Sequence, residues 1–573
     1  MQRLIGFLKP FRKQVILGPL FKLTEAVLEL FIPLMMMRII DTGVAGRDTA
    51  FICRMGGELL AVSVLGFLAA LLCQYYASLA AQGAGTDLRN AIFRHISTFS
   101  FAELDKFGTP SLINRVTADV NQLQWAVAML IRLVVRAPFL CIGGYIMAVM
   151  LDAQMSFIIL GVVAVFGLLL YFNMTRAVPL FKSVQQKLDN LARILRENLA
   201  GVRVIRAFAR VRDERARFDA AADSHAQSAI HVNRVTALVN PLTTLVMDIG
   251  ILLLVWFGAV RVNAGSLTTG TVIALINYVV DILAAMIVVA NLVSVFTKAA
   301  ASAARVNEIF DTKPSVTDGP GAMPDADAPA LAFKNVSFRY GDAAEDALTN
   351  ISFTLGKGRT LGIIGGTGAG KSTAAHLVSR FYDVTAGTVE LFGHDVREYT
   401  LSGARELLGV VPQKSMLFSG TVRDNLRWGD RAAADEELAE ALRIAQAGFV
   451  LDLPEGLDTP VLQGGVNFSG GQKQRLCIAR ALVRKPAILI LDDSASALDY
   501  MTEAALRKNL GGLAGMTVVQ ISQRAASLMH ADQILVLDEG GQAGLGTHEE
   551  LIASCPLYRE ICQSQQLIGE ESA

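Results

Sequence analysis

Residues 1–300 hold nearly all of the long uncharged apolar runs in this chain. Two of these runs, 59–86 and 153–175, contain no Asp, Glu, Lys or Arg. A helix that crosses the hydrocarbon core of a bilayer needs about 20 mostly apolar residues, and its backbone groups must pair within the helix. The apolar runs therefore predict an all-α domain that is embedded in a membrane.

Six segments of this domain are long and apolar enough to be spanning helices. The first is the least regular, because Lys22, Glu25 and Glu29 interrupt it. The connections after the second and fourth segments are long and keep helical periodicity, so the helices should continue beyond the bilayer. The predicted spans are about 15–40, 57–82, 126–150, 154–175, 236–260 and 269–297.

Basic residues indicate on which side of the membrane the loops lie. The connection between the fourth and fifth spans is rich in Arg and Lys, whereas the connections after the third and fifth spans have almost none. Lys and Arg accumulate in cytoplasmic loops. We therefore expect both long loops, both termini and the C-terminal domain in the cytoplasm, with the spans in the plasma membrane and in contact with its lipids.

Several charged residues lie within the predicted spans, where an unpaired charge is costly. They could line a polar translocation path, or they could pair with one another across the helix bundle. The sequence leaves both possibilities open. These residues are Glu25, Glu29, Arg132, Arg136, Asp248 and Asp281.

A stretch rich in Pro, Gly, Asp and Ala separates the two parts of the chain. Such residues favour turns and irregular structure. We expect a transmembrane domain at 1–310, a linker at 311–329 and a soluble α/β domain at 330–573. The formal net charge is +0, so no basic surface field points to nucleic acid as a partner.

The C-terminal domain contains a phosphate-binding loop in the context that the motif requires. An apolar strand, 360–364, leads into G-x-x-x-x-G-K-[ST], and a helical pattern follows. The glycines let backbone N–H groups surround the phosphates of ATP, Lys371 adds a cation, and Ser372 supplies a hydroxyl ligand for Mg²⁺. The predicted ATP-binding residues are Gly365, Gly366, Thr367, Gly368, Ala369, Gly370, Lys371, Ser372 and Thr373.

A second strand of the same domain ends in a carboxylate. Residues 487–491 form an apolar run that is followed by Asp492. A carboxylate held at a strand end can bind Mg²⁺ directly or through water. Asp492 is therefore a predicted magnesium ligand that would act with the phosphate-binding loop.

A further motif gives the resemblance to a family. Residues 467–475, Asn-Phe-Ser-Gly-Gly-Gln-Lys-Gln-Arg, resemble the signature motif of ATP-binding cassette (ABC) transporters, and they lie between the phosphate-binding loop and Asp492 as in that family. Segments 107–120 and 197–208 resemble the cytoplasmic-loop motifs of half-transporter exporters of type IV architecture. The resemblance implies six transmembrane helices fused to an α/β P-loop nucleotide-binding domain with an antiparallel β subdomain and a helical subdomain.

The resemblance also implies roles for residues outside the phosphate-binding loop. Tyr340, at the end of a predicted strand 332–340, would stack on the adenine of ATP. Gln413 would contact Mg²⁺ together with Ser372 and Asp492, and Asp499 would belong to a D-loop at 496–499. The signature residues would act in trans on ATP held by a partner, and they are Ser469, Gly470, Gly471 and Gln472.

Two residues depart from the family pattern at positions where the chemistry occurs. Asp493 stands where the family has the Glu that polarises the attacking water, and Gln523 stands where it has the switch His. Asp is one methylene shorter, and a misplacement of about 1 Å can cost roughly 10²-fold in rate. Gln can hydrogen-bond a γ-phosphate, but it carries no positive charge and relays no proton.

These departures give the predicted function. The chain resembles the degenerate-site subunit of heterodimeric multidrug-type ABC exporters, whose own site, here with Gln413, Asp493 and Gln523, hydrolyses ATP weakly or not at all. Its signature would complete the hydrolytic site of a second, different half-transporter. The pair would export an amphipathic drug, lipid or peptide by alternating access. A homodimeric exporter with weak hydrolysis and an ATP-gated regulatory ABC protein are the alternatives.

Overall fold

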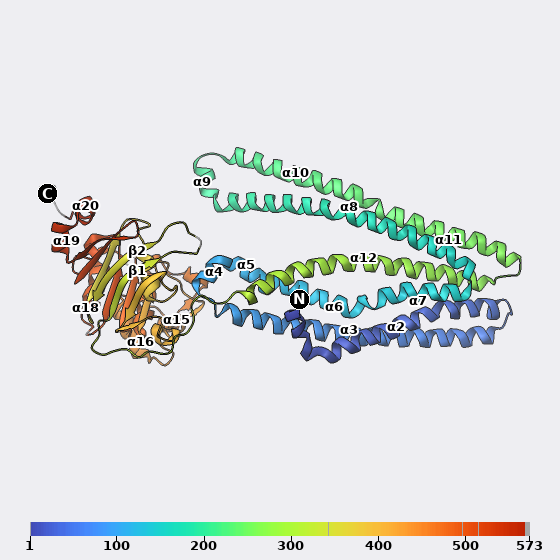
Figure 1. The fold of residues 1–573 in the computed structure, drawn as a ribbon, viewed down its shortest axis with the longest axis horizontal. Helices are drawn as coiled ribbons and strands as arrows, with labels where there is room; N and C mark the ends of the chain where they lie inside the picture. Colours follow the sequence, from blue (N-terminus) through green and yellow to red (C-terminus); the bar gives the residue numbers. More distant parts are fainter. Residues whose placement is uncertain (1, 342, 495–496, 514, 568–573) are drawn as a thin grey trace. The chain divides into compact units, whose positions relative to one another are not determined.

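The computed structural model describes residues 2–341, 343–494, 497–513 and 515–567. The chain divides into two compact units: Met1–Ile96 with Pro110–Asp311, and Ser97–Thr109 with Thr312–Ala573. The regular structure described in the first unit is helical, whereas the second unit contains the β-sheet (Figure 1).

Long helices form the first unit. Two of them, α3 and α8, each run over 48 residues. At 1.5 Å per residue such a helix is about 70 Å long, which is about twice the thickness of the hydrocarbon core. The helices thus extend beyond the predicted spans, as the sequence indicates. The described α-helices of this part of the chain, long and short, are α1 Gln2–Ile5, α2 Arg12–Arg38, α3 Thr49–Ile96, α5 Thr109–Asn114, α6 Val120–Met129, α7 Arg136–Leu151, α8 Ala153–Ala200, α9 Val202–Ala207, α10 Val211–Ala237, α11 Val239–Asn263 and α12 Thr269–Asp311. π-Helical turns lie at Ile39–Val44, Arg115–Asp119 and Leu130–Val134.

Within the described residues, five helical stretches are long and apolar enough to cross a membrane. The first predicted span, 15–40, falls on α2, which is a helix but is not one of the five, so a count of six is not reached by this test. The reason is the charge on α2, where Lys22, Glu25 and Glu29 interrupt the apolar run. The five stretches are Thr49–Ile96, Thr109–Leu151, Ala153–Ala200, Val211–Asn263 and Thr269–Asp311.

Charged side chains on α2 and α7 pair with one another. Nη2 of Arg136 donates to both carboxylate oxygens of Glu29, at 2.9 and 2.8 Å. Nζ of Lys22 lies 2.7 Å from Glu25 on the same helix. An ion pair of this kind satisfies charges that lipid would otherwise penalise. For Glu25, Glu29 and Arg136 the structure therefore matches the pairing alternative, and the Arg136–Glu29 pair ties α7 to α2.

The second unit is an α/β domain. Its helices are α4 Phe101–Phe107, α13 Lys371–Val378, α14 Leu401–Glu406, α15 Val422–Leu426, α16 Asp435–Ile444, α17 Gly470–Val483, α18 Tyr500–Gly511, α19 His548–Ser554 and α20 Pro556–Ser564. Its strands are β1 Leu331–Phe338, β2 Leu348–Leu355, β3 Thr360–Gly365, β4 Ala386–Leu391, β5 His394–Asp395, β6 Leu408–Val411, β7 Gly420–Thr421, β8 Pro460–Val461, β9 Ile488–Asp492, β10 Thr517–Ile521, β11 Gln533–Asp538 and β12 Gly541–Gly546.

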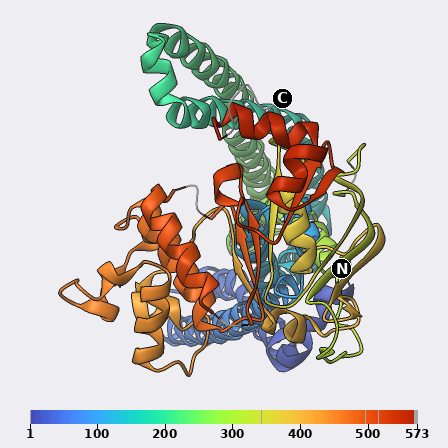
Figure 2. The same cartoon turned by 90° about the vertical axis from the view of Figure 1, so that its left-hand side faces the viewer.

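One large sheet organises this unit, with the strand order β5-β4-β1-β2-β12-β11-β3-β10-β9-β6. The strands β5, β4, β1 and β2 pair antiparallel, whereas β11, β3, β10, β9 and β6 are parallel. All five residues of β9 are buried, as expected for a parallel strand that is covered on both faces. In Figure 2 the orange helical segments lie at the left of this unit, and the olive strands, which belong to the β1–β2 end of the sheet, lie at the right.

Candidate functional site

Predicted site residues follow four neighbouring strands of the parallel sheet. β3 pairs with β10, β10 with β9, and β9 with β6, all in parallel. Ligands bind at the carboxyl ends of such strands in open α/β sheets. The loops that leave these ends carry Gly365, Gln523, Asp493 and Gln413. The topology alone therefore brings four separate motifs to one edge.

The phosphate-binding loop joins β3 to α13 through glycines that a side chain could not replace. Gly370 has a φ of 91°, and a Cβ there would lie 2.5 Å from the carbonyl oxygen of Ala347. Gly368 has a φ of 86°, which L-residues other than glycine rarely adopt. These two positions let the loop fold back tightly onto the N-terminus of α13, where free N–H groups favour an anion.

Lys371 lies at the first position of α13 and is 9% exposed. Its ammonium donates to the carbonyl oxygens of Gly365 and Gly366, at 2.9 and 2.5 Å. Burial lowers the pKa of Lys371, while the carboxylates of Asp493 and Asp492 act in the opposite direction. The loop thus holds a buried cation against its own carbonyl groups, and a phosphate would be a stronger partner for it.

Asp492 is the last residue of β9 and is buried. Its Oδ1 accepts a hydrogen bond of 2.9 Å from the hydroxyl of Ser372. Burial raises the pKa of Asp492, and the Ser372 hydrogen bond partly offsets this. Two of the three residues predicted to bind magnesium, Ser372 and Asp492, are therefore in direct contact at the base of the loop.

Asp493 follows directly in a left-handed conformation, with a φ of 45°. Its N–H donates to the carbonyl oxygen of Ile521, the last residue of β10, at 3.1 Å. Its Oδ2 lies 3.5 Å from Nε2 of Gln413. Burial raises the pKa of Asp493, and the contact with Gln413 acts against this. The hydrogen bond to β10 thus holds the backbone from which this carboxylate projects.

Tyr340 lies two residues beyond β1, so the prediction that it ends a strand is wrong. Strand pairing stops at Phe338, and Tyr340 instead opens a turn in which its carbonyl accepts from the N–H of Ala343. The Tyr340 hydroxyl donates to Oγ1 of Thr373 at 3.1 Å. The ring stands edge-on to Tyr382, with centroids 5.2 Å apart.

These residues surround one cavity of about 300 Å³. The phosphate-binding loop, the aromatic ring and the three residues Gln413, Asp493 and Gln523 all face it, although they are far apart in the sequence. Asp492 lies beneath Ser372 rather than in the lining. The lining is Tyr340, Ala347, Thr367, Gly368, Gly370, Lys371, Ser372, Thr373, Gln413, Asp493 and Gln523.

The signature residues are not part of this cavity lining. Ser469 caps α17 through a capping box, in which its N–H donates to Gln472 Oε1 at 2.8 Å and its hydroxyl accepts from the Gln472 N–H at 3.3 Å. Gly470 is exposed, and no atom lies within 4 Å of a Cβ built on it. Asp499 caps α18 by accepting from Thr502, whereas Ser496 of the predicted D-loop lies outside the described residues.

The short helix α4, from the first long loop, carries contacts that sequence reasoning missed. Asp105 accepts a hydrogen bond of 2.5 Å from the hydroxyl of Tyr382. Phe101 stacks on Phe381, with centroids 4.3 Å apart. Burial and the Asp105 carboxylate raise the pKa of Tyr382. The hydroxyl therefore stays protonated and donates a hydrogen bond to Asp105. Because Tyr382 also touches Tyr340, α4 is linked to the wall of the cavity.

Comparison with known proteins agrees with this geometry. Residues 15–286 match the ABC transporter transmembrane region, and residues 348–496 match the ABC transporter family. The ABC transporter ATP-binding protein Rv1273c of Mycobacterium tuberculosis strain H37Rv is 40% identical over 98% of this chain and 97% of its own. The multidrug efflux ATP-binding/permease protein Rv0194 of the same strain is 31% identical over 98% of this chain, which spans 47% of that longer protein.

A solved structure gives the same fold. A bacterial Atm1-family ABC exporter with ATP bound superposes with a TM-score of 0.80 and 24% sequence identity, and the match covers 98% of this chain and 99% of that one. The fold of a helical transmembrane domain fused to a nucleotide-binding domain is thus confirmed. Together with the relatives, it shows that this chain is a multi-pass membrane protein that belongs to the ABC transporter family.

Proposed function

We propose that this chain is one half of a heterodimeric ABC exporter, and that its own ATP site holds the nucleotide with little or no hydrolysis. The observation that carries the proposal is the pair of side chains at the catalytic edge. The cavity around the phosphate-binding loop is lined by Asp493 and Gln523, where a longer carboxylate and an imidazole would polarise water and contact the γ-phosphate. ATP binding needs neither of them, whereas hydrolysis uses both.

In this proposal the signature segment acts on ATP bound by the partner. Ser469 and Gly470 lie at the exposed N-terminus of the 14-residue helix α17. Such a helix end favours the phosphates of a nucleotide that approaches from outside the chain. The faster hydrolysis would therefore take place at the partner's phosphate-binding loop, completed by Ser469, Gly470, Gly471 and Gln472.

The donor set beneath the loop fits Mg²⁺. The Ser372 hydroxyl, the Asp492 carboxylate and the Gln413 amide are oxygen ligands of the kind that Mg²⁺ prefers, and the ion usually needs only one or two carboxylates besides the phosphates of its nucleotide. Within the described residues no group of three or more His, Cys, Asp and Glu side chains could hold a metal. When bound, Mg²⁺ would neutralise phosphate charge.

The transported compound is proposed to be amphipathic and to leave through the plasma membrane, with both termini and the nucleotide-binding domain in the cytoplasm. The relative Rv0194 is described as a multidrug efflux protein, which supports this substrate class. The Arg-rich connection between α8 and α11 supports the orientation, because such loops stay in the cytoplasm.

A signature variant and a phosphate-loop variant should separate the heterodimer from a homodimer. In the complex recovered from native membranes, Gly470→Asp should lower ATP hydrolysis tenfold or more, because it places a carboxylate against the partner's nucleotide. Lys371→Ala, at the proposed non-hydrolytic site, should have a much smaller effect on the same rate. ATPase activity of the purified complex is the measurement.

Gly448→Asp is the matched control, because a Cβ at Gly448 also has no atom within 4 Å and lies outside the signature. This variant should hydrolyse ATP like the unmodified complex. Equal, near-complete losses from Gly470→Asp and Lys371→Ala would instead show two equivalent sites, which is the homodimeric alternative.

The contact between α4 and the aromatic residues should matter for coupling rather than for ATP binding. Tyr382→Phe removes only the hydroxyl that donates to Asp105, and a hydrogen bond to a charged group contributes about 1.5–3 kcal/mol. We expect unchanged ATP affinity but about tenfold weaker stimulation of ATPase activity by a transported compound. Tyr399→Phe, which removes a hydroxyl bonded to the Leu391 carbonyl within the core, should leave the stimulation intact.

A further inference from the structure

A polar cavity of about 440 Å³ lies near the opposite edge of the sheet from the ATP site. Its floor includes Thr360, the first residue of β3, whereas the phosphate-binding loop starts at the last residue of that strand. One wall is the last turns of α18, and another is the segment 527–531. The cavity is therefore separate from the nucleotide site, although both use the same strands.

Three cationic or potentially cationic side chains line this cavity, namely Arg507, Lys508 and His530. The lining contains no Asp or Glu. Within the described part of the chain, none of the three makes a side-chain hydrogen bond or an ion pair, although ion pairs are common elsewhere in this unit. Lys508 and His530 are exposed and Arg507 is half-buried, so three basic side chains without ion-pair partners gather at this hollow.

Two polar side chains add hydrogen-bonding capacity without partners of their own. Ser527 is 4% exposed, yet its hydroxyl makes no hydrogen bond to any described residue. The half-buried amide of Gln520, on β10, is likewise unpaired among those residues. Both groups are therefore free to hydrogen-bond a molecule that enters the cavity. Apolar side chains of Leu510, Met516 and Val518 cover the rest of the lining.

We propose that this cavity binds a small phosphorylated molecule, with its phosphate held by Arg507, Lys508 and His530. A phosphate accepts several hydrogen bonds and carries the opposite charge, so it satisfies both the cations and Ser527. The apolar wall suits a compact organic group attached to that phosphate. This site is independent of the export function proposed above.

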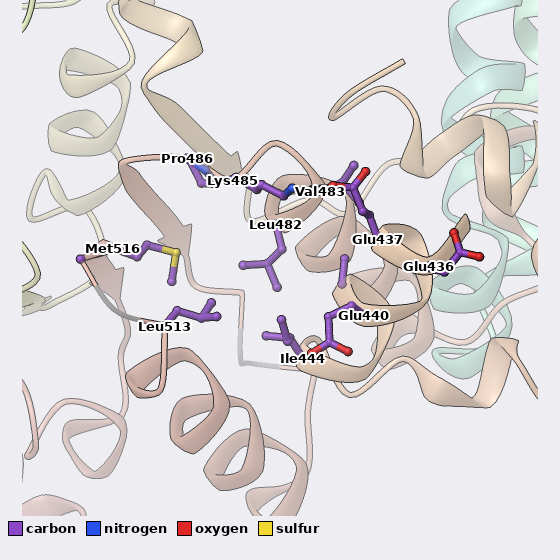
Figure 3. Close-up of a pocket in the computed structure, with 12 residues that line it drawn as sticks. Glu436, Glu437, Glu440, Ile444, Leu482, Val483, Lys485, Pro486, Leu513 and Met516 are labelled. Atoms are coloured by element: carbon purple, nitrogen blue, oxygen red, sulfur yellow. Dashed lines mark hydrogen bonds and ion pairs between the residues drawn. The ribbon is translucent and has the colours of Figure 1, made fainter. Parts of the chain in front are cut away.

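A neighbouring cavity of about 680 Å³ lacks the excess of basic side chains found in the first cavity (Figure 3). It shares the residues Leu513 and Met516 with the cationic cavity, but it is lined by Glu436, Glu437 and Glu440. Its single cation, Lys485, is paired with Glu437 at 2.5 Å. An anion should therefore avoid this second cavity, which makes Lys485 a matched control.

Binding of phenyl phosphate to the full chain in detergent, measured by calorimetry, tests the proposal. The Lys371→Ala background removes the cation of the ATP site, so that the remaining binding reports on the new cavity. Adding Arg507→Ala and Lys508→Ala should weaken binding tenfold or more. Adding Lys485→Ala, which removes a cation from the acidic cavity, should change the affinity less than twofold.

Inorganic phosphate should compete with phenyl phosphate, and phenol should not. Arg507→Lys keeps the charge and should retain most of the affinity, which separates a loss of charge from a loss of folding. Unchanged affinity in the Arg507→Ala, Lys508→Ala protein would overturn the proposal. Equal binding of phenol, or an equal loss from Lys485→Ala, would also overturn it, because binding would then not depend on a phosphate at this cavity.

Discussion

Replacing Asp493 by Glu and Gln523 by His in the same chain should raise the ATPase rate of its self-assembled dimer by about 10²-fold. The added methylene moves the carboxylate by about 1 Å toward the water that attacks the γ-phosphate, and misplacement of this size can account for a change of that order. The imidazole adds a group that can carry charge and relay a proton. The measurement is ATP turnover by the purified protein, with ATP at saturation.

The single variants are the controls for this gain. Asp493→Glu alone should recover part of the rate, and Gln523→His alone should recover little, because it leaves the carboxylate short. Asp493 adopts a φ of 45°, a region where Asp is favoured over Glu, so the variant should also lose about 1 kcal/mol of stability. A double variant that folds, binds ATP and is no faster than the original chain would refute the degenerate-site interpretation.

Lys371→Ala should weaken binding of ATP to the isolated chain by about 10- to 100-fold. The lysine supplies charge-assisted hydrogen bonds, each of which contributes about 1.5–3 kcal/mol. It already lies in the loop, 2.9 Å from the Gly365 carbonyl oxygen, so little rearrangement is needed to meet a phosphate. Binding of a fluorescent ATP analogue to the purified protein measures the loss.

Lys334→Ala is the matched control for this variant. Lys334 lies on β1 and pairs with Glu390 at 2.6 Å, with its side chain 60% exposed. An exposed ion pair of this kind contributes little, so its removal should leave the affinity for ATP unchanged. Similar affinities for Lys371→Ala and the original chain would mean that ATP does not bind at this loop.

Motifs that combine a short sequence with a local structure were predictable from the sequence. The loop Gly365–Ser372 needs only a strand before it and a helix after it, and both can be recognised from nearby residues. Apolar runs indicate spanning helices in the same way. The approach of Asp493 to Gln413 was expected only from the resemblance, because strand order, and not spacing, places β9 beside β6.

Features that depend on tertiary context were not predictable. Tyr340 continues the apolar pattern of β1, yet the chain turns after Phe338 because Ala347 pairs back onto that residue. The bond from Tyr382 to Asp105 joins residues 277 positions apart, and no local pattern signals it. For α2, the charged residues indicate a less apolar spanning helix, but they do not show that Glu29 accepts a hydrogen bond from Arg136 on α7.

The membership of α4 in the second unit has a practical consequence for protein production. A fragment that starts at residue 312 would lack Ser97–Thr109, although those residues pack with it as part of one compact body. Phe381 would lose the ring that stacks on it, and the hydroxyl of Tyr382 would lose its acceptor. Exposed aromatic patches promote self-association. Adding 97–109 as a separate peptide should therefore improve the solubility of the excised fragment.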